Sequence, residues 1–208
     1  SSGVSFAIQR NKKLPVRTAI ISDIHGNLEA LNRVLEDIGD QNIDRTVCLG
    51  DTLGYGPNPA ECADLVAEHC EWSLLGNHDY GALYEPTNFN AVAEQAAYWT
   101  RAQFDAEENK EVAAKRWEFL GSLRVRTQMD DFLCVHGTPR RPINEYLFPD
   151  DAINSPVKMK QISNISSTFE NVLIANLQSG SNNQFSQLNT LRGKLIAFSF
   201  HIQDLIDV

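Results

Sequence analysis

Three short clusters of Asp, His and Asn residues each follow directly on a short apolar run. The clusters are Ser22-Asp23-Ile24-His25-Gly26-Asn27, Gly50-Asp51 and Gly76-Asn77-His78-Asp79-Tyr80. Carboxylates, imidazoles and amides are ligands for divalent metal ions, and the first two are also the usual general acids and bases. The spacing of the clusters therefore indicates a site assembled from several strand ends.

A fourth polar residue, His136, follows the apolar run Phe132-Leu133-Cys134-Val135 in the same manner. Together with Asp23, His25, Asp51 and Asn77 it makes a mixed set of oxygen and nitrogen donors. Carboxylates brought this close repel one another unless a cation neutralises them. A metal site is therefore the favoured interpretation, and buried groups that cap loop backbones are the alternative.

The apolar runs before the first three clusters are short and rich in β-formers, as buried parallel strands are. They cover residues 18–21, 46–49 and 72–75. Asp23 and Asp51 are 28 residues apart, and Asp51 and Asn77 are 26 apart, close to the roughly 30 residues of a strand-helix-strand unit. Right-handed crossovers place the ends of such strands along one edge of a sheet.

Helix signals lie between these runs. Asn27 is a predicted N-cap, and the apolar residues that follow it recur at helical spacing until Gly39, which is predicted to end the helix. Residues 51–59 contain too much Gly and Pro for regular structure, so a loop is expected beside the site. Asn58 and Pro59 then predict a second helix that ends near His69.

Residues 84–123 predict two helices that carry many of the aromatic side chains. Packing of these aromatics against the sheet is the favoured interpretation, and a substrate-facing aromatic shelf is the alternative. Asp105 with Glu108 predicts a capping box that opens the second helix. Residues 124–128 and 132–135 then predict a hairpin that ends at His136.

The motifs D-x-H, G-D, G-N-H-D and H-G, in this order, resemble those of the calcineurin-like binuclear metallophosphoesterases. The resemblance covers roughly residues 17–151. Residues 54–57 and 144–148 are similar to the small bacterial and archaeal phosphodiesterase branch, whereas protein Ser/Thr phosphatases carry an Arg-containing loop after the second motif. The resemblance implies an α/β fold, a layered α/β/β/α-type sandwich, and leaves open whether its C-terminal side is complete.

The resemblance also implies a ligand set for two divalent transition-metal ions. Asp23 and His25 would bind one metal, Asp51 would bridge the two, and Asn77 with His136 would bind the other. The mixed donors favour Mn, Fe, Ni or Zn over Ca. Two cations held by a shared carboxylate activate water and take up charge on phosphoryl oxygens.

Two further residues of the third motif have implied catalytic roles. His78 would lie beside the leaving oxygen, where it stabilises charge or donates a proton, and Asp79 would orient its imidazole. Substrate contacts are less defined. Arg140 and Arg141 follow the fourth motif closely enough to clamp a phosphate, although a solvated charge pair is an equal alternative. Tyr55 or Tyr80 is expected to bound the pocket.

The last third of the chain departs from the family pattern. We expect a flexible segment over 1–16, the metallophosphoesterase domain over 17–160, and an atypical polar segment over 161–208. Between residues 161 and 190, 18 of 30 residues are Ser, Thr, Asn or Gln, which disfavours a compact core. Relatives normally have a Gly-His-Thr-His motif here; this chain has only His201, a weak ligand candidate. A reading-frame change and a genuine tail with weakened activity are both open.

Composition narrows the function classes. The 208 residues carry a net charge of −9, which argues against a broad nucleic-acid surface and leaves a small phosphorylated substrate, a nucleotide included. No apolar run is long enough to predict a membrane span. The four cysteines lack metal-type or redox spacing, so we expect buried thiols and a cytoplasmic location. The expected function is hydrolysis of phosphodiesters or phosphomonoesters; the alternative is a metal-poor binding or scaffold module.

Overall fold

The computed structural model describes residues 16–148, 150–166, 171–175 and 194–197. The N-terminal segment 1–15, most of the polar C-terminal segment and His201 lie outside these ranges. The strands are β1 (Thr18–Ile21), β2 (Arg45–Cys48), β3 (Arg126–Met129), β4 (Phe132–Val135), β5 (Asn171–Ile174) and β6 (Lys194–Ala197). The helices are α1 (Leu28–Asp40), α2 (Pro59–His69), α3 (Asn77–Leu83), α4 (Ala91–Asp105), α5 (Lys110–Ser122), α6 (Asp151–Asn154) and α7 (Pro156–Ser166).

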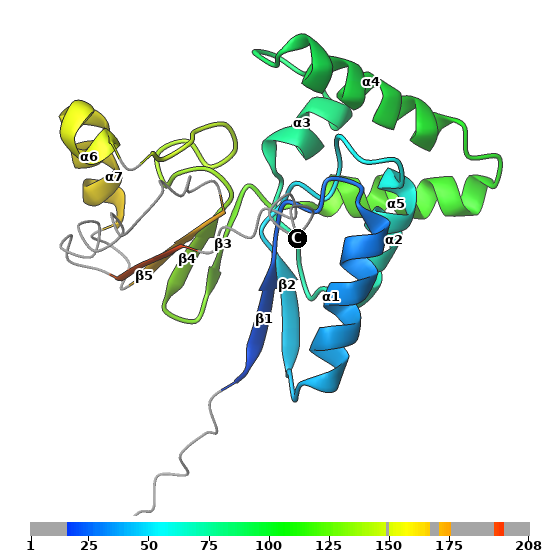
Figure 1. Cartoon of the computed structure of the whole chain (residues 1–208), viewed down its shortest axis with the longest axis horizontal. Coiled ribbons are helices and arrows are strands. Elements are labelled where there is room, and N and C mark those ends of the chain that lie inside the picture. The colour runs from blue at the N-terminus through cyan, green and yellow to red at the C-terminus, as the bar shows by residue number, and fades with distance from the viewer. Residues whose placement is uncertain (1–15, 149, 167–170, 176–193, 198–208) are drawn as a thin grey trace, which may run out of the picture.

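Two sheets form the centre of the fold (Figure 1). In the first, β1 and β2 are parallel, with Ile21 opposite Cys48. In the second, the strand order is β3-β4-β5-β6: β3 and β4 form the expected antiparallel hairpin, while β4, β5 and β6 are parallel. His136 therefore comes from the second sheet, so the site lies between two sheets and is not confined to one edge of a single sheet.

Successive side chains of a strand point to opposite faces of the sheet, so neighbouring residues of one strand pack in different layers. Val47 packs with Trp72, Cys134 and Leu173 in the core between the two sheets. The neighbouring Cys48 instead packs against α1 and α2, in a second cluster of buried residues: Ile24, Leu31, Cys48, Cys62 and Val66.

The other face of the second sheet is covered by α7. Leu133 and Val135 pack there with Ile162, and Leu147 together with Val172 and Ile174 of β5 completes this cluster. Figure 1 shows α1 and α2 beside β1 and β2, and α6 and α7 beside the other sheet. The order of layers is α/β/β/α, as expected. Residues of the polar segment after position 160 thus contribute to the core.

The helix signals of the first half are confirmed with one exception. Asn27 caps α1, its Oδ1 accepting a hydrogen bond from Ala30 N at 3.1 Å. Asn58 and Pro59 begin α2, which ends at His69. Gly39 does not end α1, which continues to Asp40; its φ is not positive, and a Cβ there would meet nothing within 4 Å.

Two other expectations were wrong. Asp105 is the last residue of α4 and does not open α5, whose cap is Asn109; the Asn109 Oδ1 accepts hydrogen bonds from Glu111 N and Val112 N. Residues 72–75 form isolated parallel bridges, Cys48 with Ser73 and Leu74 with Arg124, and no full strand. In the described part of the chain, no helix is long and apolar enough to cross a membrane.

Candidate metal centre

The polar strand ends are held together by hydrogen bonds between their backbones. Asp23 N donates to Gly50 O at 3.0 Å, His25 N to Asp51 O at 2.9 Å, and Gly26 N to Thr52 O at 3.0 Å. These bonds continue the β1–β2 pairing beyond the strands into the two loops. The first and second motifs are therefore fixed side by side by the main chain.

The backbone conformation at this junction is unusual. Asp23, His25 and Asp51 have positive φ angles of 54°, 50° and 54°. The left-handed region costs a residue with a side chain roughly 1–2 kcal/mol, and such strain gathers at functional sites. Three of the five expected ligands have this strained backbone conformation. Residues that only cap loop backbones would not require it.

Two histidines present the same ring nitrogen to the site. The Nδ1 of His25 lies 3.1 Å from Leu53 O, and the Nδ1 of His136 lies 2.8 Å from Leu49 O. A carbonyl oxygen only accepts, so each Nδ1 carries the proton and donates it. Each Nε2 is thereby turned toward the carboxylates, which is how protein histidines are oriented for metal binding.

These groups converge on the carboxylate of Asp51. Its Oδ2 lies 3.7 Å from His25 Nε2 and 3.4 Å from His136 Nε2. Asp23 Oδ1 lies 3.9 Å from His25 Nε2, and Asn77 Oδ1 lies 3.1 Å from His136 Nε2. The structure thus brings together all five residues expected to bind metal.

Two overlapping groups have the geometry to hold a cation. One is Asp23, Asp51 and His136, and the other is His25, Asp51 and His78, each with ligand atoms within 4.8 Å of one another. Asp51 belongs to both. Among the described residues, the ion-pair partners of Asp23 and Asp51 are histidines, with no Lys or Arg. Buried carboxylates with imidazoles and an amide fit divalent transition metals.

The electrostatics of the protein alone show the same need for positive charge. Burial would raise the pKa of Asp51, but the neighbouring His136, His25 and His78 hold it well below its usual range. Burial would lower the pKa of His136, but the charge of Asp51 raises it to about 9. A buried carboxylate thus depends on cationic neighbours, the condition that a bound metal also satisfies.

Asp79 has a different role from the one expected. Its Oδ2 accepts hydrogen bonds from Asp51 N at 2.8 Å and Gly76 N at 3.0 Å, and its Oδ1 accepts one from Leu53 N at 2.9 Å. Burial, with the charge of Asp51, raises its pKa to about 6. Both oxygens are occupied by main-chain donors, so Asp79 clamps the second motif to the third and does not orient His78.

Asp79→Asn is expected to lower the free energy of unfolding of the metal-free chain by about 1–3 kcal/mol. An amide has one acceptor oxygen, so at least one buried N–H would face an NH₂ group, and each such loss costs about 1–3 kcal/mol. Urea titration followed by circular dichroism measures the change. Asp131→Asn, at an exposed turn, serves as the control. A change below 0.5 kcal/mol, roughly that of a surface substitution, would contradict the clamp.

The imidazole ring of His78 packs against three other rings. Its ring centroid is 4.4 Å from Tyr55, 4.7 Å from His25 and 4.9 Å from Phe89. Burial lowers its pKa to about 4, and among the described residues its buried Nδ1 has no hydrogen-bond partner. Buried polar atoms without a hydrogen-bond partner are rare in structures, so the Nδ1 of His78 is a candidate contact for a water molecule, a metal ion or a substrate.

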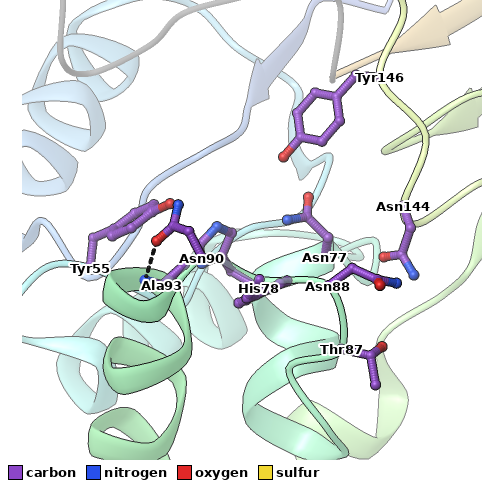
Figure 2. Close-up of a pocket in the computed structure, with 10 residues that line it drawn as sticks. Tyr55, Asn77, His78, Thr87, Asn88, Asn90, Ala93, Asn144 and Tyr146 are labelled. Atoms are coloured by element: carbon purple, nitrogen blue, oxygen red, sulfur yellow. Dashed lines mark hydrogen bonds between the residues drawn. The ribbon is translucent and has the colours of Figure 1, made fainter.

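A pocket of about 210 Å³ opens beside His78 and Asn77 (Figure 2). Tyr55 lines it, as expected, whereas Tyr80 packs on Tyr84 instead. Sequence reasoning missed Tyr146, whose hydroxyl points toward Asn77 in Figure 2. Burial raises the pKa of Tyr146, and a hydrogen bond with Asn77 partly offsets this. A signal existed, because residues 144–148 carried part of the family resemblance.

The proposed phosphate clamp is not formed by Arg140. Its guanidinium pairs with Glu145, with Nε 3.1 Å from Oε2, and also contacts Gln161. Glu145 in turn accepts a hydrogen bond from the buried Thr138. Arg140 therefore stabilises the loop after His136, and Arg141 is exposed with no described contact to the site.

The chain is similar to several known proteins. A model of the calcineurin-like phosphoesterase family matches residues 16–187. An uncharacterized protein of Methanocaldococcus jannaschii is 41% identical over 139 residues, which are 64% of this chain and 54% of that protein. The crystal structure of a metallophosphoesterase from Sphaerobacter thermophilus is 35% identical, with a TM-score of 0.56 over 77% of this chain and 60% of that one.

A more distant structure shares the fold. A protein serine/threonine phosphatase from Saccharomyces cerevisiae is 13% identical, with a TM-score of 0.51 over 91% of this chain and 69% of that one. The chain thus spans 54% of the archaeal relative and 60% of the Sphaerobacter structure. The activities of those longer proteins therefore cannot be transferred to this chain from similarity alone.

Proposed function

Because the chain belongs to the calcineurin-like phosphoesterase family, we propose that it hydrolyses phosphodiester or phosphomonoester bonds of a small substrate with the help of two divalent metal ions. The observation that carries the proposal is the paired orientation of His25 and His136. Each fixes its Nδ1 proton on a main-chain carbonyl and turns Nε2 toward Asp51.

In the proposed site, Asp23 and His25 hold one cation, Asn77 and His136 hold the other, and Asp51 contacts both. The shared place of Asp51 in both donor groups supports its position between the cations; those groups combine Asp51 with Asp23 and His136, and with His25 and His78. When bound, such cations lower the pKa of water at the site and neutralise charge on phosphoryl oxygens. Carboxylate and imidazole donors favour Mn, Fe, Ni or Zn.

The residues of the chain supply the remaining functions. His78 lines the pocket and lies in direct contact with Tyr55 and His25, so we assign it to the oxygen that leaves phosphorus, by donating a hydrogen bond or proton. The carboxylate of Asp79 accepts hydrogen bonds from the main-chain amides of Asp51 and Gly76 and so holds these two backbones together. Tyr146 lines the same pocket, with its hydroxyl toward the amide of Asn77.

Metal removal is the direct test. The chain freed of metal by chelation is expected to show no hydrolysis of bis-p-nitrophenyl phosphate, and added manganese is expected to restore it. Calorimetric titration with Mn²⁺ measures binding independently of turnover, and two sites are expected. Normal folding with no metal uptake would contradict the proposal and favour a binding or scaffold role for this fold.

A further inference from the structure

The pocket beside the candidate metal centre has an unusual lining. Four Asn side chains, those of Asn77, Asn88, Asn90 and Asn144, face it together with Tyr55 and Tyr146. In the view of Figure 2, Tyr55 and Asn90 lie toward one end and Asn88 and Asn144 toward the other, with Asn77 and His78 between them. Side-chain amides carry a hydrogen-bond donor and an acceptor side by side.

The charge of the lining limits what enters. The pocket has no Lys, Arg, Asp or Glu among its lining residues, and the nearby Arg140 is already paired with Glu145. A second phosphate or a carboxylate on the substrate would therefore have no cationic partner here. The lining suits an uncharged group that offers both donors and acceptors.

Part of the amide set is available for a ligand. Asn90 uses its Oδ1 to cap α4, accepting from Val92 N at 3.0 Å and Ala93 N at 2.9 Å, so only its NH₂ is left as a donor. For the side chains of Asn88 and Asn144, the described part of the chain provides no hydrogen-bond partner. These two amides are exposed and line one pocket without binding each other.

The aromatic lining adds a preference for a flat group. The ring of Tyr55 packs against that of His78, with ring centroids 4.4 Å apart, and Tyr55 is 54% exposed. Phe89 packs on His78 at 4.9 Å. Aromatic side chains that are accessible to a ligand serve as stacking surfaces for nucleic-acid bases. The volume of about 210 Å³ lies below the roughly 300–1,000 Å³ of pockets that enclose drug-sized ligands, so the pocket encloses one flat ring system and leaves the rest of a ligand outside.

From these observations, and resting on the proposed function, we propose that the pocket binds the nucleoside part of a phosphate ester, on the side of His78. Tyr55 stacks on the base, and the amides of Asn88 and Asn144 read its edge. An amide that donates and accepts in parallel matches the adenine edge, where an amino group stands beside a ring nitrogen acceptor. Adenosine is therefore the probe.

Binding of adenosine to the metal-free chain tests the pocket without any turnover. Calorimetric or NMR titration is expected to show binding of adenosine and none of ribose, which lacks the base. Tyr55→Ala and Asn144→Ala are each expected to weaken adenosine binding by about tenfold or more, a difference that titration resolves. Asn32→Ala, at an exposed position of α1, is expected to leave it unchanged.

Two results would overturn the inference: no binding of adenosine, or equal binding by wild type, Tyr55→Ala and Asn144→Ala. Manganese-dependent hydrolysis of bis-p-nitrophenyl phosphate by the same preparations separates the two proposals. Hydrolysis without adenosine binding removes the nucleoside pocket and keeps the phosphoesterase. Adenosine binding that Tyr55→Ala weakens, without hydrolysis, keeps the pocket and removes the enzyme.

Discussion

Asp51→Asn is expected to lower kcat/KM for bis-p-nitrophenyl phosphate by more than about 100-fold in the presence of manganese. Residues that merely support metal ligands cost about 10- to 100-fold when replaced, and Asp51 belongs to both donor groups of the candidate centre. The substitution removes charge from both metal positions at once. It is the single change that acts on the whole site.

The Asn side chain makes this a controlled comparison. It has the same shape as Asp, and its Oδ1 still accepts the hydrogen bond from His78 N that Asp51 Oδ1 accepts at 2.8 Å. The fold is therefore expected to persist, which circular dichroism of the metal-free protein checks. Asp131→Asn makes the same chemical change at an exposed hairpin turn and is expected to keep full activity. Equal rates for Asp51→Asn and wild type would exclude the proposed hydrolase.

The convergence of the strand ends could be predicted from the sequence because it depends on spacing and topology. Runs that precede Asp23 and Asp51 became the parallel pair β1 and β2, and the run before His136 became β4. Asn27 was predictable as a cap because its side chain meets a free N–H of the helix it opens. At these positions the local sequence signals favour the same structure as the packing of the whole fold.

Other features depend on contacts that sequence patterns do not contain. Asp105 and Asn109 both precede helix-forming residues, and only the structure shows that α4 continues through Asp105 while Asn109 caps α5. Asp79 follows His78 directly and was predicted to orient it. Its carboxylate instead reaches the amides of Asp51 and Leu53, 28 and 26 residues away. Such long-range partners follow from packing, which one sequence does not specify residue by residue.

The glycine before the third motif shows how closely packed the site is. A Cβ placed on Gly76 would lie 2.0 Å from Asp51 Oδ1 and 2.3 Å from Asp51 N. The backbone of Gly76 is extended, with φ of −79° and ψ of 172°, a conformation that alanine adopts without strain. The requirement for glycine here is therefore steric. It comes from the Asp51 carboxylate lying directly against the main chain of the third motif.

Gly76→Ala is accordingly expected to displace Asp51 and to cost both stability and activity. Overpacking of this kind destabilises by about 1–3 kcal/mol or more, and a shift of about 1 Å at a catalytic group costs roughly 100-fold in rate. Denaturant titration of the metal-free chain and manganese-dependent hydrolysis measure the two effects separately.

Gly121→Ala provides the matched control, because it is the same substitution in the last turn of α5, where a Cβ would meet nothing within 4 Å. There alanine is expected to leave activity unchanged and to raise the free energy of unfolding by up to about 1 kcal/mol, since glycine disfavours helix. If Gly76→Ala lowers the free energy of unfolding and Gly121→Ala raises it, the loss at position 76 comes from the contact with Asp51. If Gly76→Ala were as active and as stable as Gly121→Ala, the carboxylate would not occupy the position on which the candidate metal centre depends.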